Sequence, residues 1–163
     1  MNTLISYFVT AIFSLLAISG VAKAQTKQSL VGLWYNDDNR LATVEKDVFR
    51  QHCSDGRLIW IQRLETSSIA EWEIYMGIWR IKQNTLTYKV TLFERAQAPS
   101  FTISRKTNLT SSFDMLVGRV DSSSFQFERR WGFPPRGNVA RRVDAVPLPR
   151  VLRDKASCEQ TTS

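Results

Sequence analysis

Two carboxylates that lie two residues apart could support acid–base chemistry in this sequence. Glu71 and Glu73 share one face of a predicted strand, about 7 Å apart, and a separation of that order suits a glycosidase-type carboxyl pair. A Glu-x-Glu pair on a strand is more often a solvated edge. The sequence also has no Gly-x-Ser-x-Gly elbow, no His-Glu-x-x-His motif and no P-loop. We therefore expect a protein that is not an enzyme.

The single histidine adjoins one of the two cysteines, a combination that could supply a base and a nucleophile. Neighbouring residues on a strand point to opposite faces, so His52 and Cys53 are poorly placed to act together. Two cysteines and one histidine, without a Cys-x-x-Cys spacing, also fall short of a structural zinc site. We expect no metal and no cofactor.

The same two cysteines favour a disulfide if the chain is exported, because an even pair in an oxidising compartment usually pairs. Joining Cys53 to Cys158 closes a loop of roughly 100 residues. In the chain-entropy model such a loop contributes about 4–5 kcal/mol to the free energy of unfolding. The bond would fix the C-terminal segment to the body of the protein.

Export is indicated by the first 24 residues. An apolar run from Leu4 to Val21 precedes Ala22-Lys23-Ala24, a small-x-small site of the kind that signal peptidase cuts. We expect a signal peptide over 1–24 and a periplasmic or secreted protein. The alternative is an uncleaved anchor, although the apolar run of about 18 residues barely reaches the ~20 that span a bilayer. The remaining 139 residues (163 minus 24) suit one domain over 25–158, with a flexible tail at 159–163.

The net charge of +7 is unevenly distributed. Eight basic residues and two acidic ones lie between Arg129 and Lys155, and the rest of the mature chain is balanced. This excess is either a solvated face or a site for an anionic partner, such as a lipid headgroup or an acidic protein surface. Nucleic acid is not expected, because the chain carries an export signal and no recognition motif. The basic residues are Arg129, Arg130, Arg136, Arg141, Arg142, Arg150, Arg153 and Lys155.

The sequence predicts a chain that consists mainly of β-strands. Nearly every segment alternates with period two, and none keeps the spacing of an amphipathic helix. Short links rich in turn formers make neighbours antiparallel, which predicts an all-β, up-and-down barrel of about eight to ten strands; a β-sandwich is the alternative. A short helix is expected from Pro149 to about Ala156. The nine expected strands are Leu30–Tyr35, Thr43–His52, Arg57–Glu65, Ile69–Ile81, Asn84–Glu94, Phe101–Lys106, Phe113–Val120, Phe125–Trp131 and Val139–Ala145.

The first of these strands contains Gly32-x-Trp34, which resembles the opening of lipocalins and related calycins. That resemblance implies a barrel with an internal ligand cavity. It also implies structural roles for Gly32 and Trp34, with the indole at the closed end beneath an arginine from a late strand, here Arg129 or Arg141. A disulfide from the C-terminal tail to the barrel wall is common in that family. The second lipocalin signature, Thr-Asp-Tyr, is absent, so the resemblance is to a lipocalin-like barrel.

These features predict a small exported binding protein that holds an apolar or amphipathic ligand, such as a lipid. A binding barrel needs a cavity of at least roughly 300 Å³. The alternative is a non-enzymatic interaction module, an inhibitor or an envelope accessory protein, that uses a basic face. Asn108 begins an Asn-x-Thr glycosylation acceptor, which matters only in a eukaryote, and the oligomeric state stays open. Lining candidates come from both strand faces of the middle strands: Trp60, Trp72, Met76, Tyr88 and Phe93.

Overall fold

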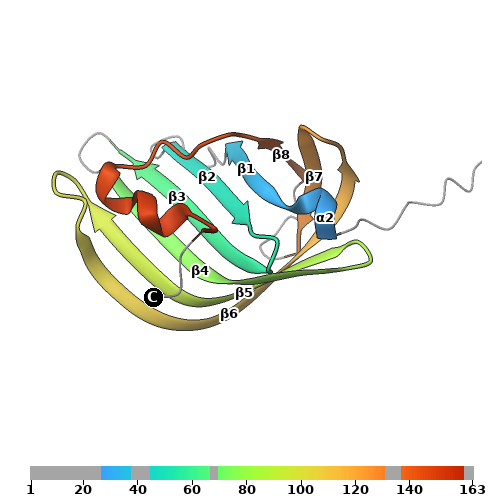
Figure 1. Cartoon of the computed structure of the whole chain (residues 1–163), viewed down its shortest axis with the longest axis horizontal. Coiled ribbons are helices and arrows are strands. Elements are labelled where there is room, and N and C mark those ends of the chain that lie inside the picture. The colour runs from blue at the N-terminus through green and yellow to red at the C-terminus, as the bar shows by residue number, and fades with distance from the viewer. Residues whose placement is uncertain (1–26, 38–44, 67–69, 131–136, 160–163) are drawn as a thin grey trace, which may run out of the picture.

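A computed structural model describes residues 27–37, 45–66, 70–130 and 137–159. In these residues the chain forms a closed antiparallel barrel in which each strand pairs with the next and β8 returns to β1 (Figure 1). The fold is therefore all-β and up-and-down, as the alternating pattern predicts. The expected signal peptide lies outside the described residues. The elements are α2 Lys27–Leu30, β1 Gly32–Asp37, β2 Glu45–His52, β3 Arg57–Glu65, β4 Ala70–Lys82, β5 Thr85–Gln97, β6 Ile103–Val120, β7 Ser124–Arg129, β8 Gly137–Arg142 and the 3-10 helix η1 Arg150–Ala156.

The strand count differs from the expectation at one place. The two strands expected over Phe101–Lys106 and Phe113–Val120 are one continuous strand, β6. The residues between them are mostly polar, which is typical of a link. They nevertheless pair with β5 through backbone hydrogen bonds, and Leu109 packs against the core. The helix expected near the C-terminus is present as η1, and α2 is an additional short element.

Residues from all eight strands fill the inside of the barrel. Directly paired residues on neighbouring strands share a face, so the register identifies the inner positions. Trp34 is opposite Arg50, which is opposite Trp60 on β3, and all three are buried. This inner core also contains Leu30, Val48, Leu58, Trp79, Leu86, Tyr88, Val90, Met115, Val117, Phe125, Phe127 and Ala140.

A second core lies on the outside of the barrel. Residues 143–158, which we call the C-terminal strap, pack on the outer face of β2 to β5, and η1 lies across these strands in Figure 1. Leu148 and Leu152 of the strap are buried there. The predicted disulfide between Cys53 and Cys158 is confirmed, and it ties the end of the strap to the loop after β2. The strand residues beneath the strap are Phe49, Ile59, Ile61, Trp72, Ile74 and Ala96.

The barrel end next to α2, which we call the proximal end, is closed by Trp34. Its indole Nε1 donates a hydrogen bond to the Leu30 carbonyl at 2.8 Å, and its ring meets Phe125 edge-on with centroids 4.9 Å apart. The arginine on this indole is Arg142, whose guanidinium lies 4.4 Å from the ring centre. The expectation of Arg129 or Arg141 is wrong, because Arg142 is the residue that pairs directly with Trp34 and so shares its face.

Gly32 has a backbone conformation that favours glycine. Its φ of +134° lies in a region that side chains disfavour, and a Cβ there would collide with the guanidinium of Arg142. An eight-stranded antiparallel barrel that is closed in this way is compatible with a lipocalin-like fold. Among the described residues, no helix has the length and apolar character needed to cross a membrane.

Candidate functional site: the distal half of the barrel interior

The inner face becomes more accessible from the proximal end to the opposite, distal end, where β1, β3, β5 and β7 finish. Along β6, Val117 and Met115 are fully buried, whereas Phe113, Leu109 and Thr107 on the same face are partly exposed. At the proximal end the rings of Trp34, Trp79 and Phe125 are at most 1% exposed. The barrel is therefore packed solid near α2, and in the distal half solvent reaches the part of the inner wall that β6 forms.

A row of aromatic rings crosses this distal wall from strand to strand. Trp60 on β3 is directly opposite Tyr75 on β4, which is directly opposite Phe93 on β5. The ring centroids are 5.2 Å apart for Trp60 and Tyr75 and 5.0 Å apart for Tyr75 and Phe93. Phe113 on β6 meets Trp60 edge-on at 5.6 Å. We call Trp60, Tyr75 and Phe93 the aromatic row; it presents a continuous apolar surface.

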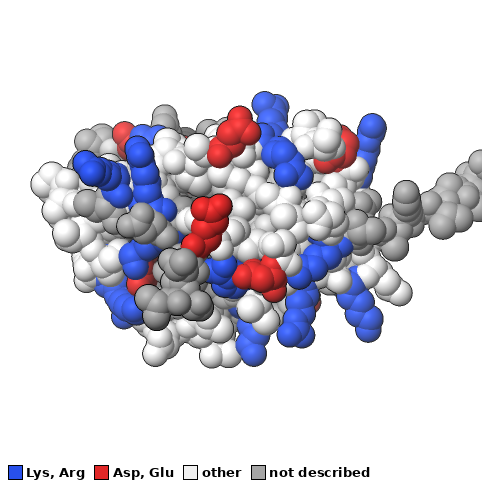
Figure 2. Space-filling model, in the orientation of Figure 1, with Lys and Arg blue, Asp and Glu red and all other residues white. Residues whose placement is uncertain are grey.

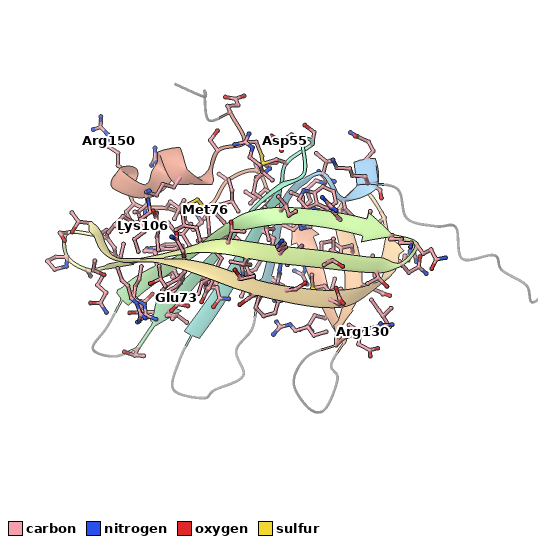
Figure 3. The ribbon with its side chains drawn as sticks, turned by 90° about the horizontal axis from the view of Figure 1, so that it is seen from below. Asp55, Glu73, Met76, Lys106, Arg130 and Arg150 are labelled. Atoms are coloured by element: carbon pink, nitrogen blue, oxygen red, sulfur yellow. A yellow bond between two sulfur atoms is a disulfide. The ribbon has the colours of Figure 1, made fainter. Side chains whose placement is uncertain are left out.

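The five expected lining residues divide between the two faces. Trp60, Tyr88 and Phe93 face inward, with Tyr88 in the packed proximal half. Trp72 and Met76 instead belong to the outer core beneath the strap. Figure 3 shows Met76 on the side of the sheet that carries η1, and Glu73 on the opposite side. The outer face is apolar because the strap covers it, as the inner face is apolar because it lines the barrel. The alternation of apolar residues alone therefore could not show which face points inward.

A buried arginine stands beside the aromatic row. Arg50 is 1% exposed, and its guanidinium lies over the rings of Trp60 and Phe127 at 5.5 and 5.1 Å. It also donates a hydrogen bond to the side-chain oxygen of Asn36. Cation–π contacts strengthen when they are removed from water, so these rings stabilise a positive charge inside the barrel. Sequence reasoning missed Arg50, although its alternation with Val48 and His52 places it on the inner face.

The carboxylate pair Glu71 and Glu73 lies at the distal end of the same face. Glu73, 7% exposed, accepts hydrogen bonds from Arg95 and from the Tyr75 hydroxyl, the latter at 2.9 Å. Glu71 accepts a hydrogen bond from Gln97 at 2.8 Å and lies 3.8 Å from Arg95 Nε. The hydrogen bond to Glu73 raises the pKa of Arg95, and burial raises that of Tyr75. Both carboxylates are thus bound in an ionic network, which fits a structural or binding role better than acid–base chemistry.

His52 has a structural environment at the proximal end. Its Nδ1–H donates to the Leu30 carbonyl at 2.9 Å, so its Nε2 accepts from the Tyr88 hydroxyl at 2.6 Å. The imidazole stacks on Trp79 with centroids 4.7 Å apart. Burial lowers the pKa of His52 to about 3, so the ring is neutral at physiological pH. Cys53 is held in the disulfide, which excludes it as a nucleophile.

The basic residues of the C-terminal third do not gather on one face. Arg129 faces inward and is 8% exposed, Arg142 covers Trp34, and Lys155 pairs with the buried Glu94 at 2.7 Å. Figure 2 shows blue side chains mainly along the outline of the face in view, with a largely white area between them. Arg136 lies outside the described residues. The remaining members, Arg130, Arg141, Arg150 and Arg153, are exposed.

Two hollows of more than 500 Å³ lie elsewhere on the described surface. One, of about 740 Å³, separates the strap from β1 and β2 and is lined by Leu33, Gln51 and Arg153 among others. The other, of about 520 Å³, runs along β6, β7 and β8 past Leu116 and Val139. The described walls of neither hollow combine aromatic rings with buried charges, as the distal interior does.

No protein-family model and no curated protein sequence matches this chain. The described residues contain no group of three or more His, Cys, Asp or Glu side chains that could hold a metal ion. The function must therefore be inferred from the geometry of the inner face.

Proposed function

We propose that this protein is an exported, non-enzymatic binding protein that holds a small amphipathic molecule in the distal half of its barrel. The observation that carries the proposal is the aromatic row on an inner wall whose neighbours are partly exposed. Apolar surface that is reachable by solvent is unfavourable unless something covers it. The apolar part of a ligand would cover Tyr75, Leu109 and Phe113, the partly exposed apolar side chains of this wall.

The charged groups around the row favour an amphipathic ligand over a purely apolar one. The inner face carries Arg50 and Arg129 near the middle of the barrel, and Arg95 with its carboxylate partners at the distal end. A ligand with one polar end would contact these groups while its apolar part lies on the rings. Barrels of this lipocalin-like kind are typically non-enzymatic, and the Arg142–Trp34 contact supports that likeness.

Export is supported by the disulfide, because such bonds persist in oxidising compartments and are rare in the cytosol. A periplasmic or secreted location would also fit the signal peptide expected over residues 1–24. Release of that segment predicts a mature protein that begins at Gln25.

The proposal is tested by native mass spectrometry of mature protein purified from its own host, followed by organic extraction and identification of any bound compound. A stoichiometric lipid or other amphiphile is the expected result. A clean unliganded mass, with no uptake of added amphiphiles, would contradict the proposal and favour an interaction module with an acidic partner.

A further inference from the structure

Two arginines stand directly opposite each other at the distal end of the inner face. Arg95 on β5 pairs in register with Arg105 on β6, and the adjacent inner pair is Phe93 with Thr107. Like charges at directly paired positions of an antiparallel sheet repel each other. Glu73 supplies an anion to Arg95, so the charge of Arg105 is the one that a further anion could offset.

Both guanidinium groups also lie over one ring of the aromatic row. The central carbon is 5.5 Å from the centre of the Phe93 ring for Arg95 and 5.9 Å for Arg105. The charge of Arg95 on β5 and the charge of Arg105 on β6 thus both lie beside Phe93, the outermost ring of the row. Phe93 is 7% exposed, so these arginines mark the boundary between the apolar wall and the solvent.

The two arginines differ in their carboxylate partners. Arg95 is bonded to Glu73 and lies near Glu71, yet its buried Nε makes no hydrogen bond to any described group. Arg105 is exposed, and within the described residues no carboxylate lies within ion-pair distance of it. One guanidinium is therefore fixed by the protein, and the other retains its donors for a ligand.

We propose that Arg95 and Arg105 bind the oxyanion head, carboxylate or phosphate, of a single-chain amphiphile whose apolar chain extends inward over Phe93, Tyr75 and Trp60. This inference rests on the proposed function and specifies the ligand's chemistry and direction. Guanidinium groups make paired, charge-assisted hydrogen bonds to such heads. The head stays at the hydrated end, and the chain lies against Tyr75, the partly exposed ring of the row.

The test measures the affinity of the mature, disulfide-bonded protein for dodecanoate, dodecyl phosphate, dodecanol and inorganic phosphate by calorimetry. Arg105→Gln removes the charge of the exposed arginine. Arg80→Gln is the matched control, because Arg80 is an exposed arginine on the outer face of β4. We expect Arg105→Gln to weaken the binding of the two anionic amphiphiles by about tenfold or more, because the substitution removes a charge-assisted hydrogen bond. Dodecanol affinity should change less than about twofold, and Arg80→Gln should change none of them.

Each contrary outcome has a distinct meaning. Equal effects of Arg105→Gln and Arg80→Gln on the anionic amphiphiles would overturn the assignment of the head site, while dodecanol binding would leave the proposed function standing. The assignment would also be overturned if Arg50→Gln, but not Arg105→Gln, abolished the preference for the anionic amphiphiles over dodecanol. The head of the ligand would then lie deeper in the barrel. Binding of inorganic phosphate alone, dependent on Arg105, would replace the amphiphile by a free anion. Binding of none of the four by the wild-type protein would contradict the proposed function itself.

Discussion

The guanidinium of Arg142 lies 4.4 Å from the centre of the Trp34 ring and closes the proximal end of the barrel. From this position Arg142 donates hydrogen bonds to the carbonyls of Val31 at 3.0 Å and Ser122 at 2.8 Å. One side chain thus connects the start of β1, the turn before β7 and the end of β8. These contacts bridge the point at which the first and last strands meet.

Substitution of Arg142 by alanine is expected to lower the free energy of unfolding by about 1–3 kcal/mol, because it removes the ring contact and two hydrogen bonds. Arg141→Ala is the matched control. Arg141 is exposed and faces the other way, so its loss should change stability by less than about 0.5 kcal/mol. Urea unfolding monitored by tryptophan fluorescence measures both. Equal stabilities for the two variants would contradict the closing role of Arg142.

His52 should stay neutral well below the usual histidine pKa. Because burial lowers its pKa in the folded state to about 3, the unfolded state binds the extra proton between about pH 6.5 and pH 3. The free energy of unfolding therefore falls with decreasing pH across this window, by up to about 1.4 kcal/mol per pH unit from this group. The measurement is an NMR titration, which is simple because the sequence contains one histidine. A ring that titrates near pH 6.5 in the folded protein would refute the prediction.

The disulfide should hold the C-terminal strap on the outer core. Replacing both cysteines by serine is expected to lower the free energy of unfolding by about 2–5 kcal/mol. The strap would then be held by Leu148, Leu152 and the Lys155–Glu94 ion pair. Trypsin should cut faster after Arg150, Arg153 or Lys155 in the serine variant, with cleavage sites read by mass spectrometry. Unchanged cleavage rates and stability would show that these noncovalent contacts suffice.

Gly77 allows a close approach of β4 to β5 at the irregularity between Val90 and Leu92. A Cβ at Gly77 would collide with the Lys89 carbonyl of the paired strand, whereas a Cβ at Gly118 would meet its nearest neighbour at an ordinary 3.5 Å. We expect Gly77→Ala to cost about 1–3 kcal/mol and Gly118→Ala less than about 1 kcal/mol. Thermal unfolding followed by circular dichroism compares them. Similar melting temperatures would mean that the backbones separate without cost.

The sequence predicted the barrel, its strand order and the disulfide, because period-two alternation and short links act locally. The sequence could not show which face of each strand points into the barrel. Trp72 and Tyr75 lie on opposite faces of one strand, and both faces are apolar because the strap covers the outer one. The strap's position depends on residues that are far apart in the sequence, such as Leu152 and Phe49, which belong to the same outer core, and no local pattern reports this.

For the same reason, the charged residues of the candidate site could not be predicted from the sequence. Arg50 is a charged residue in an alternating strand, and such residues usually face solvent. Its burial follows from the register that places it opposite Trp34 and Trp60. Arg95 and Arg105 meet through the pairing of β5 with β6, and the middle of β6 did not look like a strand.

A bulky side chain on the inner face should block the binding of an amphiphile in the distal interior. Leu109 faces inward and is partly exposed, while its neighbour Thr110 faces outward, so Leu109→Trp and Thr110→Trp place the same ring on opposite sides of β6. Uptake of dodecanoate is measured by native mass spectrometry. We predict one bound molecule in the wild-type protein and in Thr110→Trp, and none in Leu109→Trp. Equal uptake by all three proteins would place the ligand outside the barrel and contradict the proposed function.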